Sequence, residues 1–375
     1  MPDQGNQNTF STPQGSFELT RYPTRAGDPL QAWCSADTLL LSACDEQNIK
    51  GEHVLVANDD HGALSVALQP GALWTDSWLS AKAAEENFSA NGRTAVPIVW
   101  STDAPPVHCN TVVLRIPRQL PYFEYQLARL ASTLPAGTTV LAAGMDKHLS
   151  PNTAELLDKH IGPTTRHRGR RRARVFSARI QPASEKSESS GYSEYFCEPL
   201  GLHLAAAPNV FSRDKLDMGS RFLLENLHRL APAERITDLA CGNGVLGLAA
   251  LQSGLSNVLT ACDESAMAVA CTRTNFKKYA GASDVTVVQG DGLLGINAGS
   301  DLILCNPPFH LQQTVDDFAG RRLLEQAAET MPAGGRLCVV ANRHLNYQQM
   351  LRRRFSQVEL FAENPKFRIW LAYSS

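Results

Sequence analysis

An internal repeat limits the folds open to this chain more than any other feature. Residues 54–68 (VLVANDDHGALSVAL) align without a gap on residues 236–250 (ITDLACGNGVLGLAA), an offset of 182 residues. Both segments have the order apolar strand, glycine turn, apolar helix, and further matches follow, among them 112–114 with 302–304. A repeat this long indicates two duplicated domains, because solenoid repeats span only about 20 to 50 residues.

Each half alternates apolar strands with amphipathic helices, which is typical of a parallel sheet covered on both faces. We therefore expect an α/β fold with two tandem, doubly wound, Rossmann-like domains. A chain of 375 residues, 43% of them hydrophobic, can give each domain its own core. The polar stretch 183–191 predicts a linker, so we place the domains at 1–190 and 191–375.

The two copies differ where chemistry would occur. Val56 stands at the position of Asp238, and Asp60 at that of Gly242. Ile116 stands at about the position of a later asparagine of the second copy. We therefore predict that the amino-terminal copy is a degenerate duplicate, which keeps the fold and lacks the site.

The glycine turn of the second copy predicts a cofactor site. Ligands of open parallel sheets bind beyond the carboxyl ends of the strands, where Gly242 and Gly244 would let them approach the backbone. These two glycines and Gly247 nearly complete a dinucleotide motif, so an NAD enzyme is an alternative. Asp238, just before the turn, would repel a pyrophosphate and attract a cationic ligand such as S-adenosylmethionine.

Two further carboxylates follow the next two predicted strands. Asp263 comes at the end of 258–262 and can accept hydrogen bonds from ribose hydroxyls. Asp291 follows 285–289 and either accepts from an adenine amino group or is an ordinary turn residue. Asp263 therefore supports a nucleoside and does not separate S-adenosylmethionine from NAD.

The motif Asn306-Pro307-Pro308-Phe309, after the apolar strand 301–305, favours methyl transfer over hydride transfer. The Asn306 side-chain oxygen and the Pro307 carbonyl are two acceptors for an amino group, and Phe309 offers a face on which a flat base can stack. Two acceptors would stabilise the positive charge that develops on an aromatic amine as it attacks a methyl group. The motif alone could also be a plain proline turn.

The net charge is only −2, so affinity for nucleic acid would have to come from a local cluster. Six arginines lie within the nine residues 166–174: Arg166, Arg168, Arg170, Arg171, Arg172 and Arg174. So dense a run repels itself without an anionic partner, and we expect it to contact RNA phosphates. A solvated charge run is the alternative.

The nine cysteines include no CxxC pair, which argues against a zinc or disulfide framework and favours a reducing compartment. The polar first thirty residues lack the apolar region of a signal peptide, and no apolar run reaches the length of a membrane span. We therefore expect a cytoplasmic protein without a metal, a membrane anchor or an obligate protein partner.

Four motifs and the degenerate twin together resemble the ribosomal RNA large subunit methyltransferase G family. The motifs are DLACGNG (238–244), NPPFH (306–310), NVFSRDKLDMGS (209–220) and VANRHLNY (340–347). The resemblance spans nearly the whole chain. It implies two methyltransferase-type domains, S-adenosylmethionine as the donor, and N2 of one guanine in 23S ribosomal RNA as the acceptor. The amino-terminal domain would help to recognise RNA.

By position, the resemblance assigns one set of residues to the cofactor: Asp238, Gly242, Gly244, Asp263 and Asp291. It assigns a second set to the guanine: Asn306, Pro307 and Phe309. One departure is Ala240, where the family usually has glycine. Residues 209–220 carry no motif with a physical reading, and we interpret them as a loop that either caps the cofactor pocket or simply packs.

Three alternatives stay open. The sister family, ribosomal RNA small subunit methyltransferase C, shares the duplication and the NPPF loop and would act on 16S rRNA. Methyltransferases of protein glutamine or DNA adenine also use an N-P-P-aromatic loop, although a glutamine substrate would not need a basic accessory domain. A non-enzymatic RNA-binding assembly factor is disfavoured, because the second copy keeps all its site residues.

Overall fold

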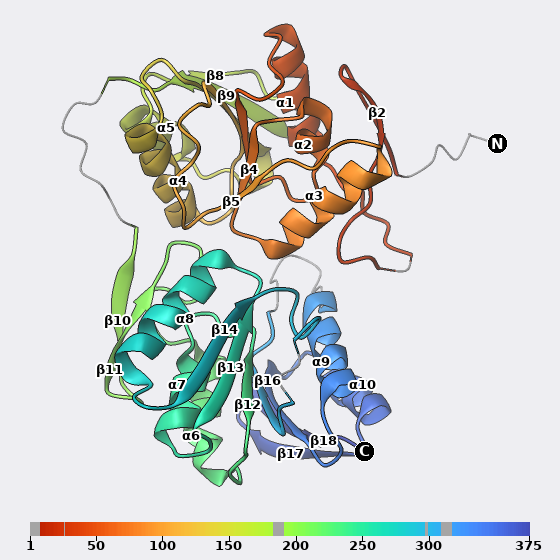
Figure 1. Cartoon of the computed structure of the whole chain (residues 1–375), viewed down its shortest axis with the longest axis vertical. Helices are drawn as coiled ribbons and strands as arrows, with labels where there is room; N and C mark the ends of the chain where they lie inside the picture. The colour runs from red at the N-terminus through yellow and green to blue at the C-terminus, as the bar shows by residue number, and fades with distance from the viewer. Residues whose placement is uncertain (1–7, 26, 183–190, 297–298, 309–316) are drawn as a thin grey trace. The chain divides into compact units, whose positions relative to one another are not determined.

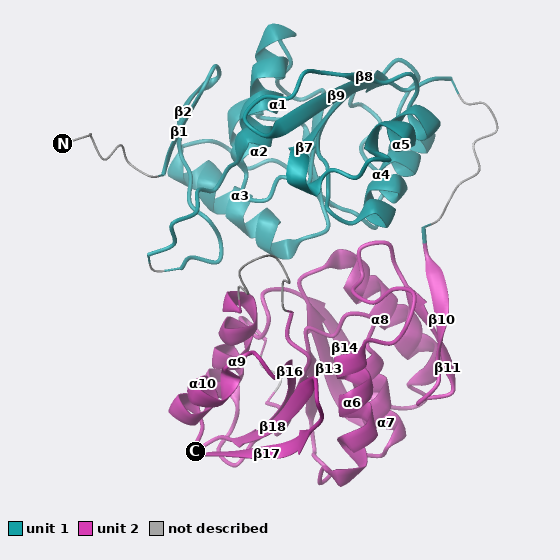
Figure 2. Ribbon diagram, turned by 180° about the vertical axis from the view of Figure 1, so that it is seen from behind, with its two compact units in different colours: residues 1–191 teal, residues 192–375 magenta. Residues whose placement is uncertain are grey.

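A computed structural model describes residues 8–25, 27–182, 191–296, 299–308 and 317–375. The chain forms two compact units, residues 1–191 (unit 1) and 192–375 (unit 2) (Figure 2). Each unit contains a seven-stranded sheet with helices on both faces (Figure 1). No helix in the described ranges is long and apolar enough to cross a membrane.

Unit 1 begins with a hairpin of β1 (Thr9–Thr12) and β2 (Gly15–Glu18). Its sheet has the order β5-β4-β3-β6-β7-β9-β8. The strands are β3 (Val54–Ala57), β4 (Ala72–Thr75), β5 (Ile98–Trp100), β6 (Thr111–Arg115), β7 (Thr139–Met145), β8 (Thr165–Arg166) and β9 (Ala173–Arg179). The helices are α1 (Ser35–Glu46), α2 (Ala63–Leu68), α3 (Trp78–Ala90), α4 (Leu120–Thr133), the 3-10 turn η1 (Asp146–His148) and α5 (Thr153–His160).

Unit 2 repeats this plan, beginning with a hairpin of β10 (Ser193–Cys197) and β11 (Leu202–Ala206). Its sheet has the order β14-β13-β12-β15-β16-β18-β17, the same topology as in unit 1. The strands are β12 (Ile236–Leu239), β13 (Val258–Asp263), β14 (Asp284–Gln289), β15 (Leu302–Cys305), β16 (Arg336–Asn342), β17 (Gln357–Glu363) and β18 (Phe367–Tyr373). The helices are α6 (Met218–Asn226), the 3-10 turn η2 (Leu227–Arg229), α7 (Val245–Gln252), α8 (Ala266–Tyr279), α9 (Phe318–Thr330) and α10 (Tyr347–Arg354).

The central strands are buried on both faces, as their continuous apolar runs predict. All four residues of β15 are buried. On one face, Leu304 packs with residues of α6, α7 and α8, while on the other Ile303 packs with residues of α9 and α10. The predicted fold of two doubly wound α/β domains is confirmed.

Both sheets are parallel except at one edge. In unit 2, β18 pairs antiparallel with both β16 and β17, and in unit 1 β9 pairs antiparallel with both β7 and β8. The cause is the short connection between β17 and β18 and between β8 and β9, because only antiparallel neighbours can be joined by a tight turn.

In each unit, the side chain of one asparagine bonds both to the glycine turn and to a segment that precedes the sheet. This segment is β11 in unit 2 and the residues after β2 in unit 1. Asn275 accepts from the amide of Ala205 at 2.8 Å and donates to the Asn243 carbonyl at 2.9 Å. Asn87 makes the equivalent bonds in unit 1, accepting from the Thr20 amide at 2.9 Å and donating to the glycine turn at 2.7 Å. Because both copies keep this clamp, it serves the fold and not the chemistry.

Candidate active site

The predicted site residues of unit 2 lie along one edge of its sheet. The strands β14, β13, β12 and β15 are neighbours in that order and run parallel. Their carboxyl ends therefore meet at the same edge, which is where ligands of such sheets bind. The glycine turn, Asp263, Asp291 and Asn306 come at or just after these four strand ends.

The glycine turn has a left-handed backbone at three positions, Ala240, Gly242 and Gly244, with φ of 60°, 56° and 81°. A Cβ added to Gly242 would meet nothing within 4 Å, so open space adjoins the turn at this point. A Cβ on Gly244 would come within 2.9 Å of Phe276 and Thr272. Gly244 is thus required for packing against α8, whereas Gly242 leaves room for a ligand.

Asp238 is fully buried at the end of β12. Its Oδ2 accepts from the Gly247 amide at 2.8 Å, which caps the first turn of α7. Its Oδ1 is buried and has no hydrogen-bond partner among the described residues. Burial raises the pKa of this carboxyl to about 7. An unpartnered buried acceptor beside the turn suits a cationic or hydrogen-bonding group of a ligand.

Asp263 joins the end of β13 to the glycine turn. Its Oδ2 accepts from the Gly242 amide at 2.9 Å, and its Oδ1 accepts from the Ser265 amide at 3.0 Å. The side chain is only partly buried. Asp291 is more enclosed, with 2% of its surface exposed, and forms an ion pair with Arg322 of α9.

Asn306 is held by its amide nitrogen. Nδ2 donates to Asp217 Oδ2 and to Ser220 Oγ, both at 2.9 Å. An ionised carboxylate only accepts hydrogen bonds, so the nitrogen must face Asp217 and the assignment of the two amide atoms is fixed by chemistry. The side-chain oxygen of Asn306 is therefore left to act as an acceptor elsewhere.

The sequence did not reveal Asp217 and Ser220 as site residues. Asp217 is the N-cap of α6 and accepts from the Ser220 amide at 2.9 Å. The segment 209–220 therefore does more than pack, because its last residues orient Asn306. An aspartate is a common N-cap residue, so the sequence could have located the start of this helix at Asp217. It could not have shown that Asp217 also binds Asn306.

The rest of the NPPF motif is described only in part. Pro307 is buried and Pro308 is exposed. A Cβ on Gly320 of α9 would lie 3.3 Å from Pro307 and would collide with the Tyr347 hydroxyl, so these groups are closely packed. Phe309, predicted to stack on the base, lies outside the described residues.

In unit 1 the register places Arg115 at the position of Asn306. Leu114 pairs with Ala57 as Cys305 pairs with Leu239, so the residue after each pair is equivalent. The assignment of Ile116 to this position was wrong by one residue, because sequence similarity alone does not determine strand register.

Arg115 closes the equivalent site of unit 1. Its guanidinium donates to Asp37 at the start of α1 and lies 3.7 Å from Asp60, the residue at the position of Gly242. Arginine has five donors and no acceptor, so this side chain cannot accept from an amino group. Where unit 2 has the Asn306 acceptor and the open turn at Gly242, unit 1 therefore has Arg115 and its carboxylate partners.

The helix cap of Asp238 also has a substitute in unit 1. Val56 holds the strand position, and Asp59 Oδ2 accepts at 2.7 Å from the Ser65 amide, the equivalent of Gly247. Burial raises the pKa of Asp59 to about 7, as it does for Asp238. Unit 1 thus keeps a carboxylate that caps this helix and lacks a carboxylate at the strand position of Asp238.

The six arginines of 166–174 lie in unit 1, on the β8–β9 hairpin. No group of three or more His, Cys, Asp or Glu side chains in the described ranges could hold a metal ion. All nine cysteines fall within those ranges, and none forms a disulfide.

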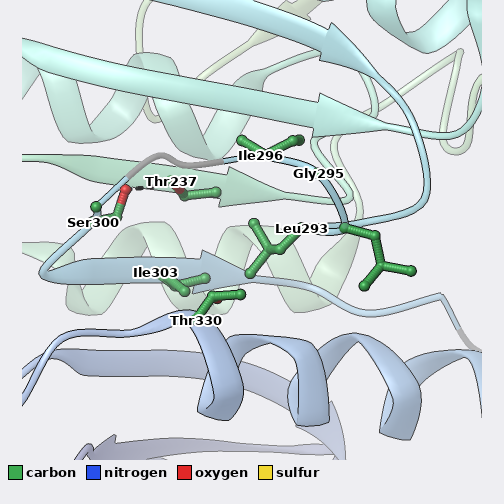
Figure 3. A pocket seen from close by; sticks show the side chains of 9 residues that line it. Thr237, Leu293, Gly295, Ile296, Ser300, Ile303 and Thr330 are labelled. Carbon is green, nitrogen blue, oxygen red and sulfur yellow. Dashed lines mark hydrogen bonds between the residues drawn. The ribbon is translucent and has the colours of Figure 1, made fainter.

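A cavity of about 470 Å³ lies elsewhere in unit 2 (Figure 3). Its lining carries no titratable side chain and consists of Thr237, Leu293, Leu294, Gly295, Ile296, Gly299, Ser300, Ile303 and Thr330. The hydroxyls of Thr237 and Ser300, two of these residues, form a hydrogen bond of 2.7 Å. Since it includes none of the predicted site residues, we do not assign the chemistry to it.

Comparisons with known proteins agree with this division of the chain. Residues 7–182 match the family model "RLMG N-terminal domain", and residues 201–371 match "Methyltransferase small domain". The chain is 42% identical over 366 residues to a ribosomal RNA large subunit methyltransferase G of Ectopseudomonas mendocina, covering 96% of this chain and 97% of the relative. It is 36% identical to the protein of the same name from Alcanivorax borkumensis, covering 96% of each.

Among solved structures, a 16S rRNA guanine N2 methyltransferase of T. thermophilus, in complex with AdoMet and guanosine, has the same fold. The TM-score is 0.77 at 21% sequence identity, over 98% of this chain and 97% of that one. Both chains therefore share the duplicated architecture along their full length.

Proposed function

Since the chain belongs to the ribosomal RNA large subunit methyltransferase G family, we propose that it methylates N2 of one guanine in 23S ribosomal RNA, with S-adenosylmethionine as the donor. The chain is an rRNA methyltransferase. The observation that carries the finer proposal is the orientation of Asn306, whose nitrogen is held by Asp217 and Ser220 so that its oxygen is left as an acceptor. We expect the enzyme in the cytoplasm, with its RNA.

The residues at the glycine turn fit S-adenosylmethionine. Gly242 adjoins open space, and Asp238 keeps one buried oxygen unpartnered within the described part of the chain. When bound, this cofactor supplies an activated methyl group on a sulfonium. We propose that Asp238 serves its cationic portion, that Asp263 accepts from the ribose, and that Gly242 and Gly244 form the turn against which it lies.

We propose the adenine amine as the donor to Asp291. The ion pair with Arg322 supports this role, because it holds the buried carboxylate in one orientation.

The guanine amine is a poor nucleophile, because its lone pair is delocalised into the ring. We propose that Asn306 Oδ1 and the Pro307 carbonyl accept its two hydrogens. As the nitrogen attacks a methyl carbon it becomes positively charged, and the two fixed dipoles stabilise this charge without reorganisation. Phe309 would stack on the extruded base, a contact worth about 1 to 3 kcal/mol.

We propose that unit 2 carries out catalysis and unit 1 recognises RNA. The closed site of unit 1 supports this division, because Arg115 and Asp37 occupy the place of the acceptor and its anchor. The arginines of 166–174 supply the charge that an RNA-binding domain needs within a chain of net charge −2.

The test is to incubate the purified chain with methyl-labelled S-adenosylmethionine and rRNA from a strain lacking its gene, then to digest the RNA to nucleosides. We expect label in N2-methylguanosine from 23S rRNA, and about a hundredfold less or lower still with the Asn306→Ala protein after the same incubation time. Label confined to 16S rRNA would assign the chain the sister activity, and label in methyladenosine would contradict guanine as the substrate.

A further inference from the structure

The edge of unit 1 that corresponds to the cofactor edge of unit 2 is rich in exposed cations. We propose that this edge is a phosphate-binding surface for RNA, formed by the turn Arg170–Arg172 together with Arg118 and Lys147. The inference rests on the proposed function in one respect, that the substrate is RNA. It goes further by locating the RNA contact on a specific edge of the degenerate domain.

Strand directions place these residues at one edge. Arg118 follows the end of β6, and Lys147 follows the end of the parallel strand β7. Strand β9 runs antiparallel to β7 and begins with Ala173 opposite Met145, so the turn before β9 lies at the same edge. The amide of Asp146 donates to the Arg172 carbonyl at 2.8 Å and fastens the turn to the end of β7.

The turn itself is strained. Arg170 and Ala173 exchange two backbone hydrogen bonds of 2.9 Å, which makes a two-residue hairpin loop. Its central residues, Arg171 and Arg172, both have a left-handed backbone, with φ of 50° and 59°. Such a type I′ turn favours Asn-Gly, because most L residues adopt a left-handed backbone only with strain. Strain of this kind gathers at functional positions, and here it presents two adjacent guanidinium groups.

The arginines of the run divide into two groups. Arg174 is bound to Asp146 at 3.3 Å and is 24% exposed, so it fixes the hairpin to β7. We therefore remove Arg174 from the predicted phosphate contacts. The other five are exposed and have no carboxylate within 4 Å in the described part of the chain: Arg166, Arg168, Arg170, Arg171 and Arg172.

Arg118 and Lys147 are exposed too, and no described carboxylate pairs with either. Burial and the positive charges of Arg118, Lys147 and Arg115 lower the pKa of His148, so these cations lie close enough to act on one imidazole. Three acids near this edge already pair with arginines, since Asp37 and Asp60 face Arg115 and Asp146 holds Arg174 of the hairpin.

An alternative is that these charges prevent the outer strand of the sheet from pairing with another chain, but this explains them less well. Charges with that role lie along the outer strand itself, and here the outer strand, β8, is only two residues long. The turn Arg170–Arg172 projects beyond the end of the strands instead. The turn can therefore contact a ligand at the carboxyl ends of the parallel strands, and it does not cover the unpaired side of β8.

The test variant is Arg171→Asn with Arg172→Gly, which removes two charges and installs the residues that the turn prefers. We expect a higher melting temperature, unchanged S-adenosylmethionine affinity, and weaker binding to a 23S rRNA fragment in filter assays. The log-log salt slope should fall by about 0.7 to 0.9 for each lost contact. A second variant, Arg118→Gln with Lys147→Gln, should lower the slope similarly without touching the turn.

The matched control is Lys50→Gln with Arg179→Gln, which removes the same charge at the opposite edge of the same sheet. Its salt slope should equal that of the wild type. An unchanged slope in both edge variants, or an equal fall in the control, would overturn the inference. Wild-type methylation of 23S rRNA separates this failure from failure of the proposed function, because it does not depend on which arginines contact phosphate.

Discussion

Asp217 should control the rate of methyl transfer although it never touches the substrate. One of its oxygens, Oδ2, accepts both from the Ser220 amide and from the Asn306 side chain, each at 2.9 Å. In Asp217→Ala, Asn306 keeps only the Ser220 hydroxyl, which can donate or accept. Both orientations of the amide then become possible, and its oxygen no longer has a fixed position.

The size of the effect follows from the bonds that are lost. A hydrogen bond to a charged group contributes about 1.5 to 3 kcal/mol, so losing this anchor should slow turnover by roughly tenfold to a hundredfold. Asn306→Ala, which removes the acceptor itself, should slow it by about a hundredfold or more. Asp217→Asn keeps both hydrogen bonds at reduced strength and should lie nearer to the wild type. Affinity for S-adenosylmethionine should hardly change in any of them.

Loss of the helix cap must be separated from loss of orientation. Asp217→Ala should also cost about 1 kcal/mol of stability through α6. Ser77→Ala is the control, because Ser77 caps α3 in unit 1 by accepting from the Ser80 amide at 3.1 Å. Single-turnover rates and urea unfolding of both variants decide the question. If Asp217→Ala lost stability like the control and kept the wild-type rate, the orienting role would be wrong.

Two further predictions concern the glycine turn and the carboxylate before it. Ala240 has a φ of 60°, so Ala240→Gly should stabilise unit 2 by about 1 kcal/mol and raise its melting temperature by roughly 2 to 4 °C, and an unchanged or lower value in calorimetry would contradict the strain. The pKa of Asp238 is raised from 3.8 to about 7, so the folded chain holds a proton that the unfolded chain releases, and stability falls as pH rises through this range. Asp238→Asn should therefore gain on the wild type by up to about 1.4 kcal/mol per pH unit between pH 4 and 7, and a constant difference in urea unfolding would contradict the shift.

The sequence was sufficient where function depends on strand ends. Asp238, Gly242 and Asn306 each follow a recognisable apolar strand, and parallel strands bring their ends together whatever the rest of the fold does. The internal repeat further indicated that the two halves share one topology. These features are local or periodic, and a single chain displays them directly.

The sequence was insufficient where function depends on distant contacts. Asn306 and Asp217 are 89 residues apart, and no local pattern joins an N-cap to the end of a strand. The equivalence of Arg115 and Asn306 required the pairing register. The strained turn at Arg171 and Arg172 was also hidden, because turn preferences favour other residues there.

The two units share one fold, and we expect only unit 2 to hold the cofactor. Calorimetric titration of the whole chain with S-adenosylmethionine tests it most directly. We expect one equivalent per chain, lost in Gly242→Asn, which fills the open space at a position whose φ of 56° asparagine tolerates. Asp60→Gly, the reverse change in unit 1, should leave the stoichiometry at one. Two equivalents in the wild type, or binding that survives Gly242→Asn, would contradict the account.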